Sequence, residues 1–203
     1  MKFITYKEWL NEQAEEPKYG CVMLDAKMDK KEWLDKHAGG IDGDDVYRKP
    51  YDDSYGLEDN PHVTVLYGIH EDEIDPEPIH DVIRDKMGQI TVTIDEIGTF
   101  ENDEYDVVKY NVPVTPELKE YRRIIEDTFP NTQTFPEYNP HVTLAYVKPG
   151  CGKKYAKKLE EPFELTFNKG VYSWHGDDGV TTRKEIVFPE PEEKINLDLN
   201  GNS

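Results

Sequence analysis

One pentapeptide, Asn-Pro-His-Val-Thr, occurs twice in this chain of 203 residues, at 60–64 and again at 139–143. Proline suits the first position of a β-strand, and residues i and i+2 of a strand project from the same face. Each copy therefore presents an imidazole beside a hydroxyl, His62 with Thr64 and His141 with Thr143. Two histidines can act as general acid and general base near neutral pH, because an ordinary pKa of about 6.5 allows one ring to be neutral while the other is charged.

A purely structural explanation of the repeat is that both histidines are buried and bond to backbone groups. A single His-x-Thr would be compatible with chance. Two copies with identical flanking residues, in matching positions of two similar halves of the chain, are harder to explain in that way. We therefore expect the two histidines and two threonines to form one shared catalytic site.

The elements that would position the motifs follow from the pattern of apolar residues. Runs of strand length and composition lie at 19–26, 62–69, 89–100, 104–114, 141–147, 163–167, 170–176 and 183–188. Asp29 and Thr115 are N-cap candidates and proline opens two helices, which together with apolar spacing predicts helices at 6–13, 29–40, 76–88, 115–129 and 152–161. Residues 41–60 show no period and are predicted to form a long loop.

The order helix, motif strand, helix and further strands occurs in both halves, so the sequence predicts an α+β fold. We expect two pseudo-symmetric lobes, each an antiparallel sheet with flanking helices, facing across a central cleft. The lobes would cover roughly 19–100 and 101–188 of a single bilobal domain, between an N-terminal extension at 1–18 and a flexible polar tail at 189–203. A chain of this length can bury a core without disulfides or structural metals.

Composition excludes several classes of protein. A formal net charge of −19 repels a long polyphosphate backbone, so a protein that wraps duplex DNA is disfavoured, whereas a small or end-bound nucleotide is compatible with it. No stretch approaches the ~20 apolar residues of a membrane span, and the first residues lack the apolar segment of a secretory signal. Cys21 and Cys151 have no Cys-x-x-Cys spacing. We expect a cytoplasmic monomer with reduced cysteines and no membrane partner.

At the two motifs, HVTVLYG (62–68) and HVTLAYV (141–147), the sequence resembles the two-histidine (2H) phosphoesterases, which include LigT-like RNA 2′,5′-ligase/phosphodiesterases and 2′,3′-cyclic phosphodiesterases. The similarity in element order extends from about residue 19 to residue 188. The resemblance implies a metal-independent phosphodiesterase without a cofactor, in which His62 and His141 are acid and base in an order left open. It also implies that Thr64 and Thr143 bind non-bridging phosphate oxygens.

The implied substrate is a nucleotide or RNA-end phosphodiester, 2′,3′-cyclic or 2′,5′-linked. The loop at 41–60, the acidity and the N-terminal extension depart from the family pattern. One alternative is a nuclease for cyclic di- or oligonucleotide immune signals, of the kind that some phages use against bacteria. An alternative of another class is a non-catalytic nucleotide- or RNA-binding module that kept the fold, although the two complete motifs argue against it.

Residues that bind the substrate are harder to assign. Tyr138 and Trp174 are candidates for stacking a base. Lys148 opens a local basic cluster that continues with Lys153, Lys154, Lys157 and Lys158. The loop at 41–60 leads into the first motif strand and is expected to cover the substrate. No metal site is expected, because the acidic segments at 41–46 and 175–180 lack the Gly and Glu placement of a calcium loop.

Two further expectations concern the remaining histidines and two tyrosines. His175 is the one other histidine expected near the cleft, and His37, His70 and His80 are expected at the surface. Tyr67 and Tyr146 each stand five positions after a motif histidine. Strict alternation along a strand would turn both tyrosines to the opposite face, toward the core.

Overall fold

Seven strands and three α-helices form the part of the chain that the computed structural model describes, which is residues 18–133, 137–176 and 180–190. None of these helices is long and apolar enough to cross a membrane. The predicted helix at 6–13 and most of the predicted tail lie outside the described residues. The strands are β1 (Tyr19–Ala26), β2 (His62–His70), β3 (Ile90–Phe100), β4 (Asp106–Asn111), β5 (His141–Val147), β6 (Lys157–His175) and β7 (Thr181–Val187), and the helices are α2 (Lys30–Lys36), α3 (Pro76–Lys86) and α4 (Pro116–Thr128).

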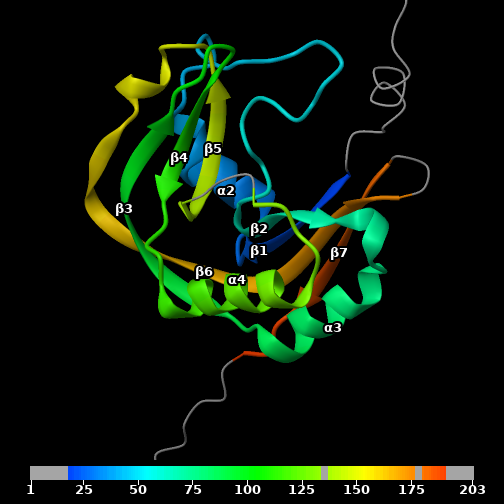
Figure 1. The fold of residues 1–203 in the computed structure, drawn as a ribbon. Coiled ribbons are helices and arrows are strands. Elements are labelled where there is room, and N and C mark those ends of the chain that lie inside the picture. Colours follow the sequence, from blue (N-terminus) through cyan, green and yellow to red (C-terminus); the bar gives the residue numbers. More distant parts are fainter. Residues whose placement is uncertain (1–17, 134–136, 177–179, 191–203) are drawn as a thin grey trace, which may run out of the picture.

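All seven strands belong to one antiparallel sheet with the order β2-β1-β6-β3-β4-β5, and β7 also pairs with β6. Strand β6 is 19 residues long, and it pairs with β3 through its first part and with β1 and β7 through its second part (Figure 1). The predicted α+β class is confirmed. The sheet is continuous, however, where a separate sheet was expected for each lobe, because the runs at 163–167 and 170–176 are one strand.

The strands do not divide between the two halves of the sequence at residue 100. β3 and β4 form a hairpin, in which Ile97 pairs with Tyr110 and Phe100 pairs with Val107. One part of the sheet thus consists of β5, β4, β3 and the first part of β6, and the other consists of β2, β1, the second part of β6 and β7. Each part carries one motif strand at its edge.

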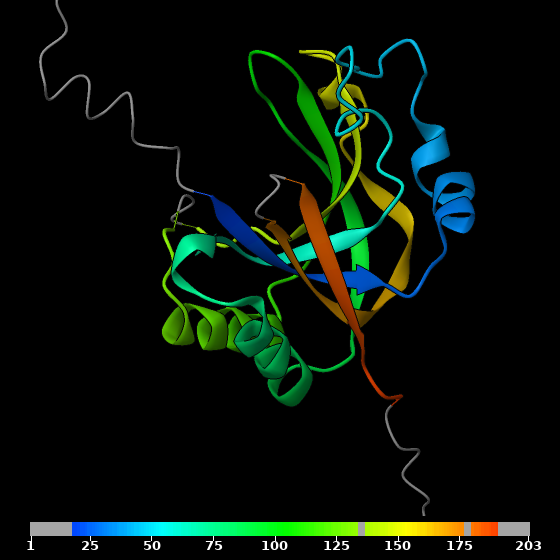
Figure 2. The same cartoon turned by 90° about the vertical axis from the view of Figure 1, so that its right-hand side faces the viewer.

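The helices at 29–40, 76–88 and 115–129 form close to their predicted positions. The Asp29 side chain accepts a hydrogen bond from the N–H of Glu32 at 2.9 Å, and the Thr115 hydroxyl accepts one from the N–H of Leu118 at 3.2 Å. Both residues are therefore N-caps, as predicted. Helices α3 and α4 pack on the part of the sheet that contains β2 and β7, and α2 packs on the other part (Figures 1 and 2).

The predicted helix at 152–161 is wrong. A single turn of 3₁₀-helix forms at Gly152–Lys154, and β6 begins at Lys157. Lys157 and Lys158 pair with Ile97 and Glu96 of β3. Pairing with a neighbouring strand outweighs the moderate helix propensity of a lysine-rich segment.

The core lies between the sheet and the helices. Val63 and Val142, the central residues of the two motifs, are fully buried there. Gly170 of β6 allows α3 to come close, because a Cβ atom at this position would lie 2.2 Å from Cγ2 of Ile83. With the apolar residues of the motif strands buried on this face, the motif histidines and threonines lie on the other face.

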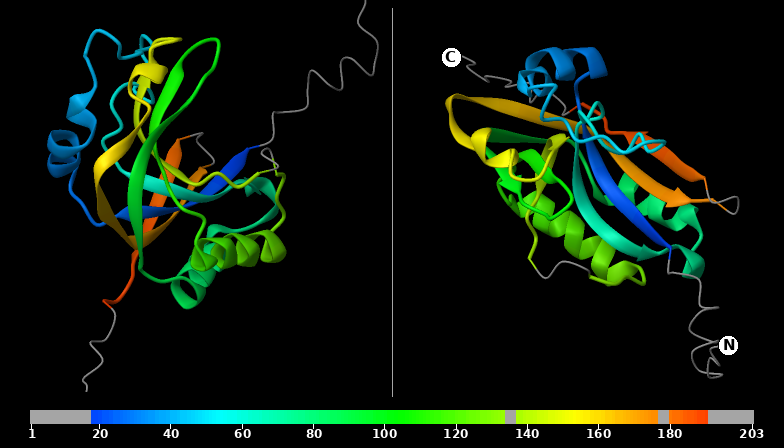
Figure 3. Two further views of the ribbon diagram at one scale, coloured as in Figure 1. Left: turned by 90° about the vertical axis from the view of Figure 1, so that its left-hand side faces the viewer. Right: turned by 90° about the horizontal axis from the view of Figure 1, so that it is seen from above.

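The loop at 41–60 lies along the free edge of β5 (Figure 3). Its first arm, around Asp45 and Tyr47, makes two backbone hydrogen bonds here: Tyr47 N–H to Tyr146 O and Lys148 N–H to Asp45 O. Its second arm, around Gly56 and Glu58, makes two more: Tyr146 N–H to Gly56 O and Glu58 N–H to Leu144 O. The indole of Trp33 also donates to the Glu58 carbonyl at 2.9 Å. The loop therefore supplies the edge of β5 with partners that a further strand would otherwise supply.

Candidate active site

The two motif strands stand at opposite ends of the strand order and yet lie close together. The sheet curves so that β2 and β5 come into contact (Figures 1 and 3). Tyr138, just before the second motif, donates from its hydroxyl to the carbonyl of Thr64 in the first motif at 3.0 Å. His62 is near enough for its charge to lower the pKa of His141. The fold thus brings the two motifs to one place.

In both motifs the histidine ring is fixed by the carbonyl group two residues before it. His62 Nδ1 lies 2.8 Å from the carbonyl oxygen of Asn60, and His141 Nδ1 lies 2.9 Å from that of Asn139. A carbonyl oxygen only accepts, so Nδ1 carries the proton in each ring and Nε2 is left to accept or donate one. The asparagine of each pentapeptide therefore sets the tautomer of its histidine.

The strand next to β5 brings a lysine to the site. Lys109 of β4 pairs with Thr143, and Asn111 pairs with His141. Directly paired residues lie on the same face of a sheet, so the ammonium of Lys109 belongs to the face that carries the motif. Sequence reasoning missed this residue, because a lysine within a strand ordinarily faces solvent, whereas Lys109 is only 6% exposed.

The surroundings of His141 favour its neutral form. The ring of Phe100 packs edge-on against the His141 ring, with 5.0 Å between the ring centres. Burial is the main cause that lowers the pKa of His141, the hydrogen bond to Asn139 opposes it, and the charges of Lys109 and His62 lower it further. A neutral ring with Nδ1 occupied is suited to accept a proton at Nε2.

His62 has a partly buried ion pair beside it. Asp25 of β1 pairs with His62 across the ladder and is 4% exposed. Arg183 of β7 forms an ion pair with Asp25, and in the amide orientation that satisfies both groups it also donates to the side-chain oxygen of Asn60 at 2.7 and 2.8 Å. Burial raises the pKa of Asp25, and Arg183 opposes this shift. Arg183 thereby links β7 to Asn60, the residue whose carbonyl holds His62. No pattern in the sequence indicates this link.

A β-bulge occurs at the same place in both motif strands. The pairing of β2 with β1 skips Val65, and the pairing of β5 with β4 skips Leu144. One extra residue reverses the alternation beyond it, so Tyr67 and Tyr146 turn to the face that carries the motif residues. The prediction that Tyr67 faces the core is wrong, since it is 44% exposed. Tyr146, also expected in the core, is partly buried, and its ring contacts that of Tyr55 in the loop at 41–60.

Of the three residues predicted to bind substrate, Tyr138 alone lies beside the motifs. Its hydroxyl is engaged by the Thr64 carbonyl, and the guanidinium of Arg122 lies 4.7 Å from the centre of its ring. Lys148 instead holds the loop, because its ammonium donates to the carbonyl of Asp44 at 2.7 Å. The rest of the basic cluster is partly neutralised, Lys153 by Glu101 and Lys154 by Asp45.

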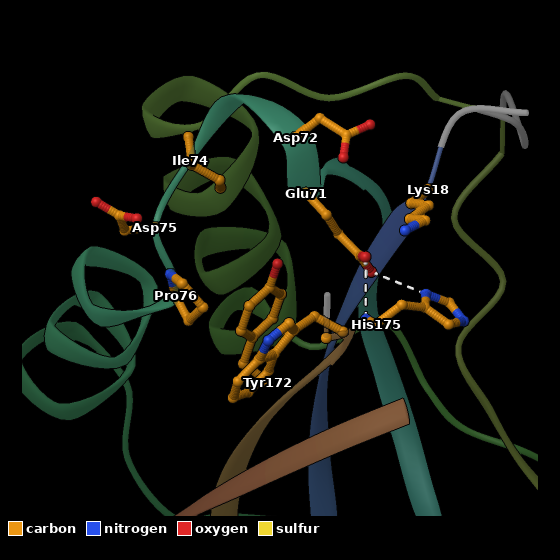
Figure 4. Close-up of a pocket in the computed structure, with 10 residues that line it drawn as sticks. Lys18, Glu71, Asp72, Ile74, Asp75, Pro76, Tyr172 and His175 are labelled. Atoms are coloured by element: carbon orange, nitrogen blue, oxygen red, sulfur yellow. Dashed lines mark hydrogen bonds and ion pairs between the residues drawn. The ribbon is translucent and has the colours of Figure 1, made fainter. Parts of the chain in front are cut away.

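Trp174 and His175 lie away from the motifs. Trp174 stacks on Tyr172 with 5.1 Å between ring centres and contacts His80 of α3, so it lies on the helix-covered face of β6. His175 pairs with Glu71, just beyond the end of β2 that is remote from the motif (Figure 4). Both residues line a cavity of about 340 Å³. His80, expected at the surface, is 2% exposed because it lies on the face of α3 that packs against the rings of Tyr172 and Trp174.

The other polar residues do not suggest a metal centre. Among residues 18–133, 137–176 and 180–190, no group of three or more His, Cys, Asp or Glu side chains is placed to hold a metal ion. Cys21 and Cys151 are both free. Burial raises the pKa of Cys21, which lies beside the hydroxyl of Thr64, to about 12, so its thiol is protonated at neutral pH.

Comparisons with known proteins concern the family and the fold of the chain. The sequence pattern of the 2′-5′ RNA ligase superfamily matches residues 36–178. At the level of sequence, no curated protein matches the chain. Among solved structures, E. coli LigT with 3′-AMP has a TM-score of 0.53 at 14% identity, covering 86% of this chain and 100% of that one.

Two further solved structures share the fold at similar distance. Usb1 of Kluyveromyces marxianus with uridine monophosphate has a TM-score of 0.52 at 12% identity, over 84% of this chain and 98% of that one. The protein TT0787 of Thermus thermophilus has a TM-score of 0.53 at 13% identity, over 83% of this chain and 97% of that one. The match of the family pattern covers more than half of the chain and includes both motifs. The resemblance to the 2H phosphoesterases is thereby confirmed, and the chain belongs to the 2′-5′ RNA ligase superfamily.

Proposed function

We propose that this protein is a metal-independent phosphodiesterase that cleaves a nucleotide or RNA-end phosphodiester, 2′,3′-cyclic or 2′,5′-linked, by acid-base catalysis with two histidines. One observation carries the proposal. Both histidines are held through Nδ1 by the same kind of carbonyl, on two edge strands that meet, and among the described residues no hydrogen bond occupies Nε2 of either ring. In-line cleavage of a phosphodiester requires two such groups, one to remove a proton and one to supply it.

In this mechanism His141 is the base and His62 is the acid. Nε2 of His141 takes the proton of the attacking water or hydroxyl while that oxygen bonds to phosphorus. Nε2–H of His62 gives its proton to the leaving oxygen as the P–O bond breaks. The lowered pKa of His141 supports this assignment, because it favours the neutral ring that a base requires. Exchange of protons with water restores both rings after each turnover.

The two threonines act on the phosphate group. Thr64 and Thr143 stand two residues after the histidines on the same face of their strands, so their hydroxyls are placed to donate to the non-bridging oxygens. These bonds gain strength as charge develops on the oxygens in the transition state. Neither step uses a metal ion, and the histidines supply both proton transfers.

Two observations support a substrate of nucleotide size. The net charge of −19 opposes long polyphosphate chains, which bind through many cation contacts. The similar folds of LigT and Usb1 were solved with 3′-AMP and uridine monophosphate, respectively. A nuclease for cyclic di- or oligonucleotides would use the same four motif residues and differ in the substrate alone. A non-catalytic binding module would not require a free Nε2 on both rings.

A panel assay in excess EDTA tests the proposal. Purified protein is incubated with 2′,3′-cyclic, 2′,5′-linked, 3′,5′-linked and cyclic-oligonucleotide substrates, with the His62→Ala/His141→Ala double variant as control. We expect cleavage of a 2′,3′-cyclic or 2′,5′-linked substrate by the wild-type protein only. Cleavage restricted to cyclic oligonucleotides favours the immune-signal nuclease. Activity that EDTA abolishes and a divalent ion restores contradicts the metal-independent mechanism, and binding without cleavage favours the binding module.

A further inference from the structure

Lys109 is a buried cation in the site whose charge has no direct counter-ion among the described residues. It lies in the middle of β4, it is 6% exposed, and it pairs across the ladder with Thr143. Its charge is near enough to His141 to affect that ring. Lysine is seldom buried to this extent without an opposite charge beside it.

The contacts of Lys109 leave part of its hydrogen-bonding capacity unused. Within the described part of the chain it forms no ion pair, and its ammonium donates to the side-chain oxygen of Asn111. The amide nitrogen of Asn111 donates to Glu96 at 2.6 Å, and the charge of this carboxylate raises the pKa of Lys109 although the two side chains form no ion pair. The ammonium also lies 4.3 Å from the centre of the Phe100 ring, a cation–π contact. An ammonium has three N–H donors, so an acceptor can still be added.

Burial of the Lys109 ammonium without an ion-pair partner is energetically costly, and this cost indicates that the site lacks an anion. Burial is the main cause that lowers the pKa of Lys109 and the charge of Glu96 opposes it, because an ammonium without an ion-pair partner is disfavoured away from water. Arg183, on the His62 side of the site, differs because it is paired with Asp25. An anion that enters beside Thr143 would supply the opposite charge and accept the remaining N–H donors of Lys109.

We propose that Lys109 is a further catalytic residue, whose ammonium binds a non-bridging oxygen of the scissile phosphate next to Thr143. This inference rests on the proposed function and adds an electrostatic element to it. A lysine ammonium is a compact point charge that suits a phosphate oxygen. It stabilises the charge that develops on that oxygen in the transition state, which is where fixed positive groups contribute most to the rate. The site is then asymmetric, with an ammonium open to an anion on the Thr143 side and a paired guanidinium on the His62 side.

A structural role for Lys109 predicts a different set of results. If the lysine only packs on Phe100 and bonds to Asn111, its replacement lowers the melting temperature and leaves anion binding unchanged. Binding of a simple anion therefore separates the two roles, and it does so without any assumption about the substrate. Inorganic phosphate is the probe, and the ring signals of His62 and His141 in NMR spectra report its binding.

The test compares three variants with the wild-type protein. Lys109→Met keeps the aliphatic stem and removes the charge, Lys109→Arg keeps a charge, and Lys153→Met removes a surface charge that is paired with Glu101. We expect Lys109→Met to bind phosphate at least ~10-fold more weakly and to lose about 10²-fold in kcat/KM on the best substrate of the panel. Lys109→Arg should retain part of the phosphate affinity, and Lys153→Met should behave as the wild type in both assays.

The outcomes are distinguishable. Equal phosphate affinity in the wild type and Lys109→Met overturns the inference, as does the absence of any phosphate-dependent shift of the histidine signals in the wild type. If phosphate binding depends on Lys109 but no substrate is cleaved, the anion site stands and the proposed function fails. If a substrate is cleaved equally well without Lys109, the proposed function stands and the role of Lys109 fails. Circular dichroism verifies folding, and Lys109→Gln replaces Lys109→Met if the latter is unfolded.

Discussion

The hydroxyl of Tyr138 donates a hydrogen bond to the backbone carbonyl of Thr64 at 3.0 Å, and this bond joins the lead-in of the second motif to the first motif. Burial raises the pKa of Tyr138, so its hydroxyl stays protonated and remains a donor. Arg122 packs over its ring and restricts it further. The relative position of the two motif histidines therefore depends on a residue outside both motifs.

Tyr138→Phe should lower the rate more than the stability. The variant loses one hydrogen bond, which costs about 1 kcal/mol in the free energy of unfolding. A small displacement of one motif against the other should lower kcat by ~10-fold or more, because proton transfer depends on alignment. Denaturant unfolding and steady-state kinetics measure the two effects. Tyr121→Phe is the control, since its hydroxyl bonds to Gly88 away from the motifs. Equal kcat values in both variants would show that the Tyr138 bond does not position the site.

The two histidines should act as a unit. His62→Ala and His141→Ala should each lower the rate by ~10²-fold or more, because each removes one of two coupled proton transfers. The double variant should lose far less than the product of the single losses, since the second substitution removes a partner that is already idle. Thr64→Ala and Thr143→Ala should have milder effects, as proton transfer is intact in them. A single His→Ala variant that folds normally and retains near-full turnover would refute the shared site.

The stability of the fold should fall as the pH falls below about 6.5. Burial is the main cause that lowers the pKa values of His37, His80 and His141 in the folded protein. Unfolding returns each ring to about 6.5, so between the folded and unfolded values the unfolded chain binds more protons. Above that window these three groups leave the free energy of unfolding unchanged. As the pH falls through the window, they lower it. Chemical denaturation at a series of pH values on both sides of the window measures the slope, which should be smaller in His80→Gln; an unchanged slope would contradict the assignment.

Arg183→Met should destabilise the protein through Asp25. The substitution leaves a buried carboxylate without its partner, and a broken buried ion pair costs several kcal/mol. Because Arg183 is 30% exposed, we expect a smaller loss of about 2 kcal/mol. Asp25→Asn in the same chain should recover part of this loss, since the uncompensated charge is gone. Denaturant unfolding of both single variants and the double variant tests the coupling, and strictly additive losses would show that the two residues act independently.

The sequence predicts well what depends on local pattern. The N-caps Asp29 and Thr115 located two helix starts, and the pentapeptide located two strands with valine inward and histidine outward. Long-range pairing is not encoded in such patterns. The pairing of Lys157 with Ile97 turned an expected helix into a strand, and the length of β6, which pairs with β3 and then with β1, joined two expected sheets into one.

The face occupied by a side chain was predictable only up to the first bulge. Alternation places His62 and Thr64 correctly, but the unpaired Val65 reverses it for Tyr67. The contribution of Lys109 and Arg183 depends on which strands lie next to the motif strands, and strand order cannot be derived from residue spacing. Sequence reasoning therefore found the groups proposed to transfer protons and missed the cations around them.

The loop at 41–60 provides the last prediction. Both arms of the loop are hydrogen-bonded to the backbone of Tyr146 in β5. The N–H of Tyr47 in the first arm donates to the Tyr146 carbonyl, and the Tyr146 N–H donates to the carbonyl of Gly56 in the second arm. The segment 48–55 between the arms makes no backbone hydrogen bond to β5 among those of the described residues. A short Gly-Ser linker can thus replace residues 48–54 and keep these hydrogen bonds, with Tyr55 retained because its ring packs on Tyr47 and Tyr146.

If the segment 48–55 covers the substrate, the shortened variant should fold normally and show a higher KM or a changed preference across the panel. The smallest 2′,3′-cyclic substrates should be affected least, because they reach least far beyond the motif residues. Leu57→Ala, within the second arm that pairs with Ala145, is the comparison: it should lower stability and kcat by loosening β5, with little change in substrate preference. Unchanged kinetics of the shortened variant on every substrate would restrict the loop to covering the edge of β5.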